Sequence, residues 1–421
     1  MKKVLVVGAG AQGGPCASIL ARDKDISEIR LGDIDTELAN KVKDKIKSDK
    51  LTVLKLDAAK IEEVEKAAIG VDVIINLTLT TFNSNIMKAA LKNGTHYVDT
   101  SFGEPTLLDI RARDNILSQI IEKRPIELSA EFEKAELTAL LGCGGSPGVV
   151  NVLTRYVCDK LDRVDEIRIK MGEKHLGSSE EVVSGWEPTW SPFRALWGYA
   201  VEPTIFEDGE YRKYPIFSKC ENYTFPEPAG VVPIVYHQHQ EQISLPHFIG
   251  KGIRYCDFKY PVDTLAGAFI KMGFANSEAI EVKGVKVAPL DVLMKLVRHP
   301  VDSFFTEDEN TTKLPLKYAE ICVLEVKGAK SGEEMTCKLS WPFTLFSNAQ
   351  EKSEVYRNFG ATLIGVALPA AVGAKMCMGG DAKRGVICAE CLDSSKFLGM
   401  MDDMGGPVRF NEVVSKEVSI E

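Results

Sequence analysis

Residues 2–7 read KKVLVV, and residues 8–13 follow at once as GAGAQG. The apolar run is typical of a buried strand, and G-x-G-x-x-G directly after such a strand predicts a dinucleotide-binding turn. Its glycines permit a tight turn, a close approach of the backbone to a pyrophosphate, and close packing of the next helix, expected over 14–22. Free N–H groups at the start of that helix attract phosphates. The predicted cofactor-binding residues of the turn are Gly8, Gly10, Gln12 and Gly13.

An acidic residue ends the second predicted strand, over 28–33. Asp33 follows the third glycine by about twenty residues, where an acid accepts hydrogen bonds from the hydroxyls of the adenosine ribose. Asp35 adds a second negative charge, and no arginine follows immediately. The 2′-phosphate of NADP would be repelled, so the pattern favours NAD as the cofactor. The alternative is that Asp33 and Asp35 only cap a turn.

The first 150 residues alternate strand and helix patterns, which predicts an α/β fold with a Rossmann-like, doubly wound parallel sheet. Further strands are expected at 51–56, 71–77, 96–99 and 137–141. Ligands bind beyond the carboxyl ends of the strands in such sheets. We therefore assign three more residues, each following a strand, to the cofactor: Asp57, Thr78 and Gly144.

After residue 162 the pattern changes to alternating, strand-like runs, which predicts an inserted α+β substrate domain. Strands are expected at 164–171 and 281–287. Hairpins are expected around Asp208-Gly209 and around residues 327–332, because such turn residues stand between extended flanks.

From residue 358 the chain is apolar and helical in pattern, and we expect it to return to the first domain. The polar tail from residue 413 is expected to be loose. The predicted boundaries are a dinucleotide-binding domain over 1–150, a substrate-binding and dimerisation domain over 151–356, and a C-terminal segment over 357–421.

Composition excludes several classes of protein. The net charge of −9 and the lack of a long basic run argue against nucleic-acid binding. No window approaches the roughly twenty apolar residues that span a bilayer. Ten scattered cysteines with no secretory signal indicate reduced thiols and a cytoplasmic protein. The lone C-x-x-C at Cys388 and Cys391 has no second ligand pair nearby, so no metal site is expected.

Together these motifs resemble the saccharopine dehydrogenase-like family, and within it the lysine 6-dehydrogenases. The matching stretches are VVGAGAQG at 6–13, GTHYVD at 94–99 and GCGGSPGVVN at 142–151, with looser matches at 202–209, 239–246, 362–365 and 385–390. The substrate half departs from the family pattern, because a histidine-rich stretch stands where the family usually has a small residue and Glu before Thr-Leu-Pro.

The resemblance implies a Rossmann domain, an inserted substrate domain and a C-terminal return. It also implies NAD-linked hydride transfer at a C–N bond of a small amine or amino acid, foremost the oxidative deamination of lysine. Saccharopine and carboxynorspermidine relatives instead reduce an imine formed from an amine and an aldehyde or keto acid. An alternative of another class is a non-catalytic NAD sensor.

Reaction at a C–N bond requires a proton to leave or reach the nitrogen, so a base is needed near the amine. In an extended segment His237, His239 and Glu241 would share one face, and imidazoles titrate near neutral pH. We propose His239 and Glu241 as catalytic and His237 as substrate-binding. A metal site, which hydride chemistry does not need, and a hydrogen-bonded structural edge are the alternatives.

Asp99 is the third catalytic candidate, because it ends a central strand and would hold an ammonium group or polarise a water molecule. Its alternative role is a cap on the next segment. Ser101 and Gly145 are assigned to the substrate, since backbone N–H groups in a glycine-rich loop bind carboxylates. No covalent step is required, so Cys143 is expected to pack or contact the cofactor.

Arg194 or Arg254 is expected to clamp a substrate carboxylate through two hydrogen bonds. Residues 186–197 hold three of the four tryptophans. A flap over the cleft, a dimer contact and core filling all remain open for this segment. The apolar, aromatic second domain predicts a homodimer.

Overall fold

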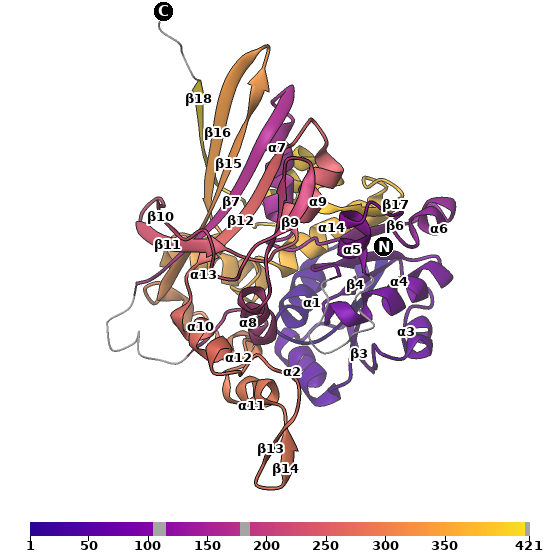
Figure 1. The fold of residues 1–421 in the computed structure, drawn as a ribbon. Helices are drawn as coiled ribbons and strands as arrows, with labels where there is room; N and C mark the ends of the chain where they lie inside the picture. The colour runs from indigo at the N-terminus through magenta and orange to yellow at the C-terminus, as the bar shows by residue number, and fades with distance from the viewer. Residues whose placement is uncertain (104–114, 177–185, 417–421) are drawn as a thin grey trace, which may run out of the picture.

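The computed structural model describes residues 1–103, 115–176 and 186–416. Its first sheet has seven parallel strands in the order β3-β2-β1-β4-β5-β6-β17 (Figure 1). These strands are β1 Lys2–Val7, β2 Ile26–Asp33, β3 Leu51–Lys55, β4 Val73–Asn76, β5 His96–Asp99, β6 Thr138–Leu141 and β17 Gly385–Cys388. The strand order reverses between β1 and β4, and ligands bind at such a switch point. The predicted Rossmann-like sheet is confirmed.

Helices cover both faces of this sheet, as the apolar strands require, because every residue of β4 and β6 is buried. They are α1 Gly13–Arg22, α2 Thr36–Ile46, α3 Ile61–Ala67, α4 Asn83–Lys92, α5 Ile116–Ile121, α6 Ser129–Lys134 and α7 Val149–Cys158, with a short 3₁₀ turn η1 at Thr80–Phe82.

The seventh strand comes from the far end of the chain. β17 pairs with β6, and α14 (Ala367–Gly379) packs on β4, β5 and α1. The expected helical return to the first domain is thereby confirmed. The helix begins later than the apolar pattern suggests, because Gly360 adopts a left-handed conformation (φ 71°) that ends the preceding helix α13 (Ala349–Phe359).

The second sheet has the strand order β10-β11-β12-β7-β15-β16-β18, and β8 and β9 extend it from β12. All its pairs are antiparallel except β12 with β7. Its strands are β7 Arg163–His175, β8 Thr204–Glu207, β9 Glu210–Lys213, β10 Glu221–Thr224, β11 Val231–Tyr236, β12 Tyr255–Pro261, β15 Tyr318–Lys330, β16 Glu333–Pro342 and β18 Asn411–Lys416.

Both predicted hairpins form. β8 and β9 join through Asp208 and Gly209, which both have positive φ angles of 52° and 85°. This is the backbone that a two-residue hairpin loop requires. β15 and β16 pair along their length around residues 331–332.

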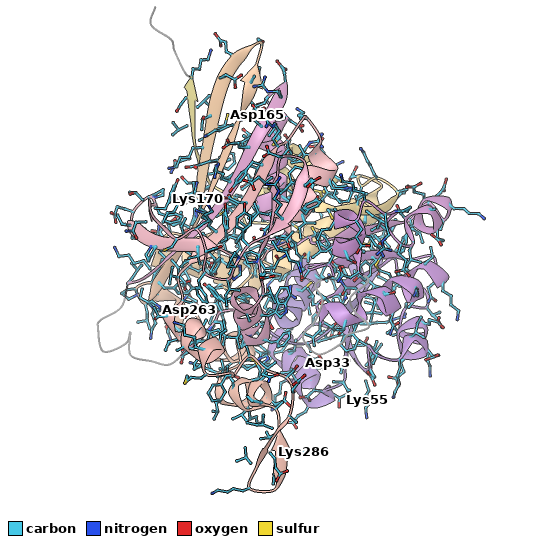
Figure 2. The ribbon with its side chains drawn as sticks, in the orientation of Figure 1. Asp33, Lys55, Asp165, Lys170, Asp263 and Lys286 are labelled. Carbon is cyan, nitrogen blue, oxygen red and sulfur yellow. The ribbon has the colours of Figure 1, made fainter. Side chains whose placement is uncertain are left out.

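Two predictions in the second half are wrong. The run at 281–287 is a hairpin of its own, β13 (Ile280–Val282) and β14 (Val285–Val287), because Lys283 and Gly284 adopt positive φ. Lys286 marks this hairpin, which projects from the molecule (Figures 1 and 2). The tail is ordered up to residue 416, because β18 pairs with β16 and Glu412 accepts a hydrogen bond from Lys160 at 2.6 Å. Residues 417–421 lie outside the described residues.

The remaining helices complete the second half. They are α8 Pro192–Ala200, α9 Glu241–Ile249, α10 Thr264–Lys271, α11 Pro289–Leu296, α12 Val301–Thr306 and α15 Ser394–Asp403, with 3₁₀ turns η4 Thr311–Lys313 and η5 Ala389–Cys391. Among the described residues, each helix is too short or too polar to cross a bilayer.

A buried hydrogen-bonded group links the returning segment to the helices between the two sheets. Asn151 of α7 donates to Glu390 of η5 at 3.0 Å and to Ser244 of α9 at 3.3 Å, and all three side chains are buried. Burial raises the pKa of Glu390 to about 7, and the hydrogen bonds that Glu390 itself makes, with Ser244 and with Asn151, oppose this shift.

This shift makes stability depend on pH. Because the folded protein holds the Glu390 proton more tightly than the unfolded chain does, the folded state loses stability as pH rises from the unfolded pKa through about 7. Glu390→Gln cannot ionise. We expect its unfolding free energy, relative to wild type, to rise by about 1–3 kcal/mol between pH 5 and pH 8 in urea titrations.

Glu281→Gln, at an exposed position of β13, is the matched control and should show no such change. A difference between Glu390→Gln and wild type that is equal at both pH values would contradict an ionisation linked to folding.

Candidate active site

A cavity of about 130 Å³ opens where the glycine turn of the first domain meets the second sheet. Gln12 of the turn, Ser146 of the loop after β6, and His239 of the loop before α9 all line it. Residues 362–366, between α13 and α14, contribute Thr362, Leu363, Gly365 and Val366. Residues of both sheets complete the lining, so the pocket is built from segments that are distant in the sequence.

The glycine turn fits a dinucleotide. Gly8 has φ +100°, and a Cβ on Gly13 would lie 1.8 Å from the Gly8 carbonyl oxygen, so α1 packs against the turn as only glycine allows. A Cβ on Gly10 would meet nothing within 4 Å, which leaves room for a phosphate. Gln12 Oε1 is buried and has no hydrogen-bond partner among the described residues, so it is available to accept one from a ligand.

Asp33 (Figure 2) points at this turn. Its Oδ2 accepts a hydrogen bond from the N–H of Ala9 at 2.6 Å, and its Oδ1 accepts one from the N–H of Asp35 at 2.8 Å. Asp35 caps α2 by accepting from the N–H of Leu38 at 3.0 Å. Capping therefore describes Asp35, whereas Asp33 is oriented over the glycine turn.

Of the predicted cofactor residues Thr78 and Asp57, only Thr78 lies next to the glycine turn. The methyl group of Thr78 packs beside Gly8, and its hydroxyl donates to Asn76 at 2.6 Å. Asp57 follows β3, where its Oδ1 accepts from the N–H of Ala59 at 3.0 Å. Thr78 thus adjoins the turn, and Asp57 lies beyond β2 at the edge of the sheet.

Asp99 is buried in a polar network and does not line the pocket. Its carboxylate accepts from the Gly142 N–H at 2.7 Å and from Tyr97 and Asn83, each at 3.0 Å. Burial raises its pKa to about 7, and these hydrogen bonds oppose the shift. The network anchors the start of the glycine-rich loop after β6.

His239 and Glu241 do come together, but not on an extended segment. β11 ends at Tyr236, and Glu241 is already the first residue of α9, so the predicted common strand face of the three residues is wrong. Glu241 is fully buried, binds His239 Nδ1 through Oε2, and accepts from the Ser146 hydroxyl through Oε1. The His239 ring stacks on Phe258 at a centroid distance of 4.2 Å.

The hydrogen-bonded series Ser146–Glu241–His239 fixes the orientation of the His239 ring. Its Nδ1 is occupied by Glu241, so Nε2 is the ring nitrogen left for a substrate in the pocket. Ser146 belongs to the first domain and hydrogen-bonds Glu241 of the second. The sequence does not predict this contact, because the two residues are far apart in the chain and share no motif.

His237 is buried and does not line the pocket. Its ring is buried against Tyr199, with centroids 4.6 Å apart, and close to Gly198, and neither ring nitrogen has a partner among the described residues. Burial, followed by the neighbouring His239, lowers its pKa well below the usual value, so the imidazole is neutral. The structure places it beside His239, at 6.1 Å between ring centroids, but not on the pocket wall.

The other predicted substrate residues form two groups. Ser101 accepts from Arg194 at 3.2 Å and from Gln240 at 2.7 Å, which ties the loop after β5 to α8 and to the start of α9. Gly145 packs against Phe343 and the Gly365 carbonyl, which leave no room for a Cβ on Gly145. Phe343 and Gly365 line the pocket. Gly144 lies beside it, against Thr100 and Val366.

The tryptophan segment divides between two settings. Trp186 donates to Asp263 at 2.8 Å and packs on Phe269 in the cluster around α10 and α11. Trp190 lines the pocket.

Cys143 is buried and donates to the Pro369 carbonyl, as expected for a residue that packs in the core. Among the described residues, no cluster of three His, Cys, Asp or Glu side chains is placed to hold a metal ion.

Two acidic residues of the site escaped sequence reasoning. Glu320 of β15 lines the pocket, and Glu173 of β7 stands directly opposite it in the antiparallel pairing. Each occurs in an ordinary strand pattern, and only the register between two distant strands makes them neighbours. No signal in the sequence alone identifies this pair.

Two family models cover nearly the whole chain: the saccharopine dehydrogenase NADP binding domain over residues 4–140 and the saccharopine dehydrogenase C-terminal domain over 144–406. Carboxyaminopropylagmatine dehydrogenase from Synechocystis sp. is 24% identical over 99% of this chain and 98% of its own. Carboxynorspermidine synthase from Vibrio alginolyticus is also 24% identical, over 96% and 95%.

Solved structures share the fold. Saccharopine dehydrogenase (L-Glu forming) from Saccharomyces cerevisiae matches with a TM-score of 0.68 at 16% identity, covering 99% of this chain and all (100%) of its own. Homospermidine synthase from Legionella pneumophila, solved with NAD, matches with a TM-score of 0.65 at 12% identity, covering 98% and 91%. The chain belongs to the saccharopine dehydrogenase family and is a nicotinamide-dependent oxidoreductase.

Proposed function

We propose that this protein reduces an imine formed between an amine and a small aldehyde or keto acid that carries a carboxylate, with NADH as the reductant. The observation that carries the proposal is one pocket lined by the glycine turn, His239 and Glu320. This pocket joins a cofactor site to a proton-transferring ring and to a carboxylate.

The relatives support this reaction over the deamination of lysine. Their names describe carboxylated oligoamines, which are products of joining a carboxylate-bearing unit to an amine. The pocket chemistry agrees, because Glu320 is its acidic residue and neither lysine nor arginine is among the described residues that line it. An amine without a carboxylate of its own suits such a wall better than an amino acid does.

His239 performs the proton transfers in this proposal. Its Nε2 accepts a proton from the substrate ammonium, so that the neutral amine attacks the carbonyl carbon. The same proton then returns to the hydroxyl of the adduct, which leaves as water and yields the protonated imine. Glu241 stabilises the imidazolium between the two transfers, and Ser146 holds that carboxylate in place. A nicotinamide cofactor held by the glycine turn and Asp33 would supply the hydride for the reduction of the imine.

Two further roles follow from the predicted residues. Arg194 does not line the pocket itself but hydrogen-bonds Ser101 beside the loop after β5, and it is proposed to bind the carboxylate of the carbonyl partner from there. Asp33 is proposed to bind the adenosine ribose, since it is held over the glycine turn, and its charge selects NAD over NADP.

An amine panel tests the reaction. The purified protein should oxidise NADH when an amine and a carboxylate-bearing aldehyde or keto acid are supplied together, because both are needed to make the imine. Either partner alone should give no turnover. Reduction of NAD by lysine alone would contradict the proposal and assign the protein to lysine deamination.

Cofactor choice is tested at Asp33. In Asp33→Ala, the affinity for NADH measured by fluorescence titration should fall about tenfold or more, because a hydrogen bond to a charged acceptor is worth roughly 1.5–3 kcal/mol. The affinity for NADPH should change much less or improve. Equal small losses for both cofactors would remove Asp33 from the ribose site.

The proton-transfer role is tested at His239. His239→Gln should lower kcat by about 10²- to 10⁴-fold, because general acid–base catalysis contributes that much. Glu281→Gln, on the exposed hairpin, serves as the control and should retain wild-type kcat. A His239→Gln variant with wild-type kcat would show that another group transfers the proton.

A further inference from the structure

Two carboxylates face each other on the side of the second sheet that is turned toward the first domain. Glu173 and Glu320 are directly opposed across β7 and β15. On β15, Glu320 shares its side with Cys322 and Leu324, which belong to the main hydrophobic core. Like charges directly opposite on paired strands destabilise a sheet. The pair therefore costs stability unless something positive lies between them.

No such charge comes from the part of the chain that the structure describes. Tyr260 donates to Glu320 at 3.4 Å, and no described lysine, arginine or histidine forms an ion pair with either glutamate. Burial and then Glu173 raise the pKa of Glu320 to about 8, and burial and then Asp263 raise that of Glu173 to about 7. A cation bound beside the two carboxyls would offset their mutual repulsion and favour their ionised forms.

Aromatic rings complete the surroundings of Glu320. Trp190, Phe258, Tyr260 and Tyr318 line the same pocket. Aromatic faces attract ammonium and guanidinium groups, and a carboxylate among them adds a charge partner. This wall is suited to a cation on an apolar carbon chain, which is the chemistry of a diamine or longer oligoamine.

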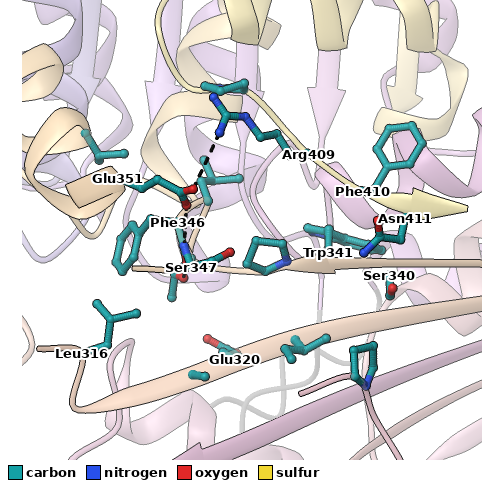
Figure 3. A pocket seen from close by; sticks show the side chains of 18 of the residues that line it. Leu316, Glu320, Ser340, Trp341, Phe346, Ser347, Glu351, Arg409, Phe410 and Asn411 are labelled. Atoms are coloured by element: carbon teal, nitrogen blue, oxygen red, sulfur yellow. Dashed lines mark hydrogen bonds and ion pairs between the residues drawn. The ribbon is translucent and has the colours of Figure 1, made fainter. Parts of the chain in front are cut away.

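A second, larger cavity of about 500 Å³ lies next to Glu320 (Figure 3). Glu320 and Thr344 line both cavities. The charged residues around the larger one are Glu227, Glu320, Glu351, Glu354, Asp402 and Arg409, and Arg409 pairs with Glu351 at 3.7 Å. The charged lining of this larger cavity is thus mainly acidic.

We propose that Glu320, together with Glu173, binds a second cationic group of the amine substrate, so that the enzyme selects oligoamines over monoamines. The reacting nitrogen lies at His239, the next ammonium or guanidinium group lies at Glu320, and further cationic groups of longer substrates enter the acidic cavity. This assignment rests on the proposed imine reduction and adds the class of amine and the residues that select it.

Binding measurements separate this assignment from the reaction itself. Calorimetry on the full chain with NADH should give tighter binding of putrescine than of butylamine, which has the same carbon chain and one charge. In Glu320→Gln, the ratio of the two affinities should fall about 10- to 100-fold, because a charged hydrogen bond worth roughly 1.5–3 kcal/mol is lost. Glu281→Gln, the matched control, should keep the wild-type ratio.

A variant at the larger cavity tests whether longer oligoamines extend into it. Glu354→Gln, on the exposed side of α13 at the larger cavity, should weaken spermidine by a few-fold and leave putrescine unaffected. Glu173→Gln supplies the same test as Glu320→Gln if the latter does not fold. An unchanged ratio in a folded Glu320→Gln or Glu173→Gln would overturn the assignment. Selective oligoamine binding without any turnover would instead sustain it and overturn the imine reduction.

Discussion

Two backbone contacts that leave no room for a side chain set the position of the pocket. A Cβ on Gly13 would lie 1.8 Å from the Gly8 carbonyl oxygen, and a Cβ on Gly148 would lie 1.7 Å from that of Gly144. Each contact lets a helix, α1 or α7, start directly against the end of a strand. The residues between these glycines, Gln12 and Ser146 among them, are thereby held at the same edge of the sheet, where the second sheet meets them.

The local parts of this arrangement can be predicted from the sequence, because they depend on neighbouring residues. The glycine turn, the alternation of strands and helices, and the hairpin at Asp208 and Gly209 each follow from short-range rules of backbone conformation. The helical return of the chain to the first domain also follows from the apolar C-terminal pattern, whereas the strand β17 and its pairing with β6 do not. By contrast, β18 is mostly exposed, and only β16 across the sheet makes it a strand.

The same contrast between local and long-range determinants applies to the residues of the site. His239 and Glu241 are close in sequence and were identified together, but a strand end and a helix start bring them into contact, which periodicity does not reveal. Asp99 has the position of a site residue in the strand pattern, yet Tyr97 and Asn83 enclose it. Glu173 and Glu320 are 147 positions apart, and only their register reveals them as a pair.

The proposed chemistry requires opposite protonation states on one substrate. The reacting nitrogen must be neutral to attack a carbonyl, while the distant nitrogen must stay charged to be recognised. Two separate settings meet these demands. In the proposed reaction, the imidazole of His239, hydrogen-bonded to Glu241, takes up a proton, and the facing carboxyls of Glu320 and Glu173 favour a cation. The separation between His239, in the loop before α9, and Glu320, on the second sheet, then determines which nitrogen of an oligoamine is proposed to react.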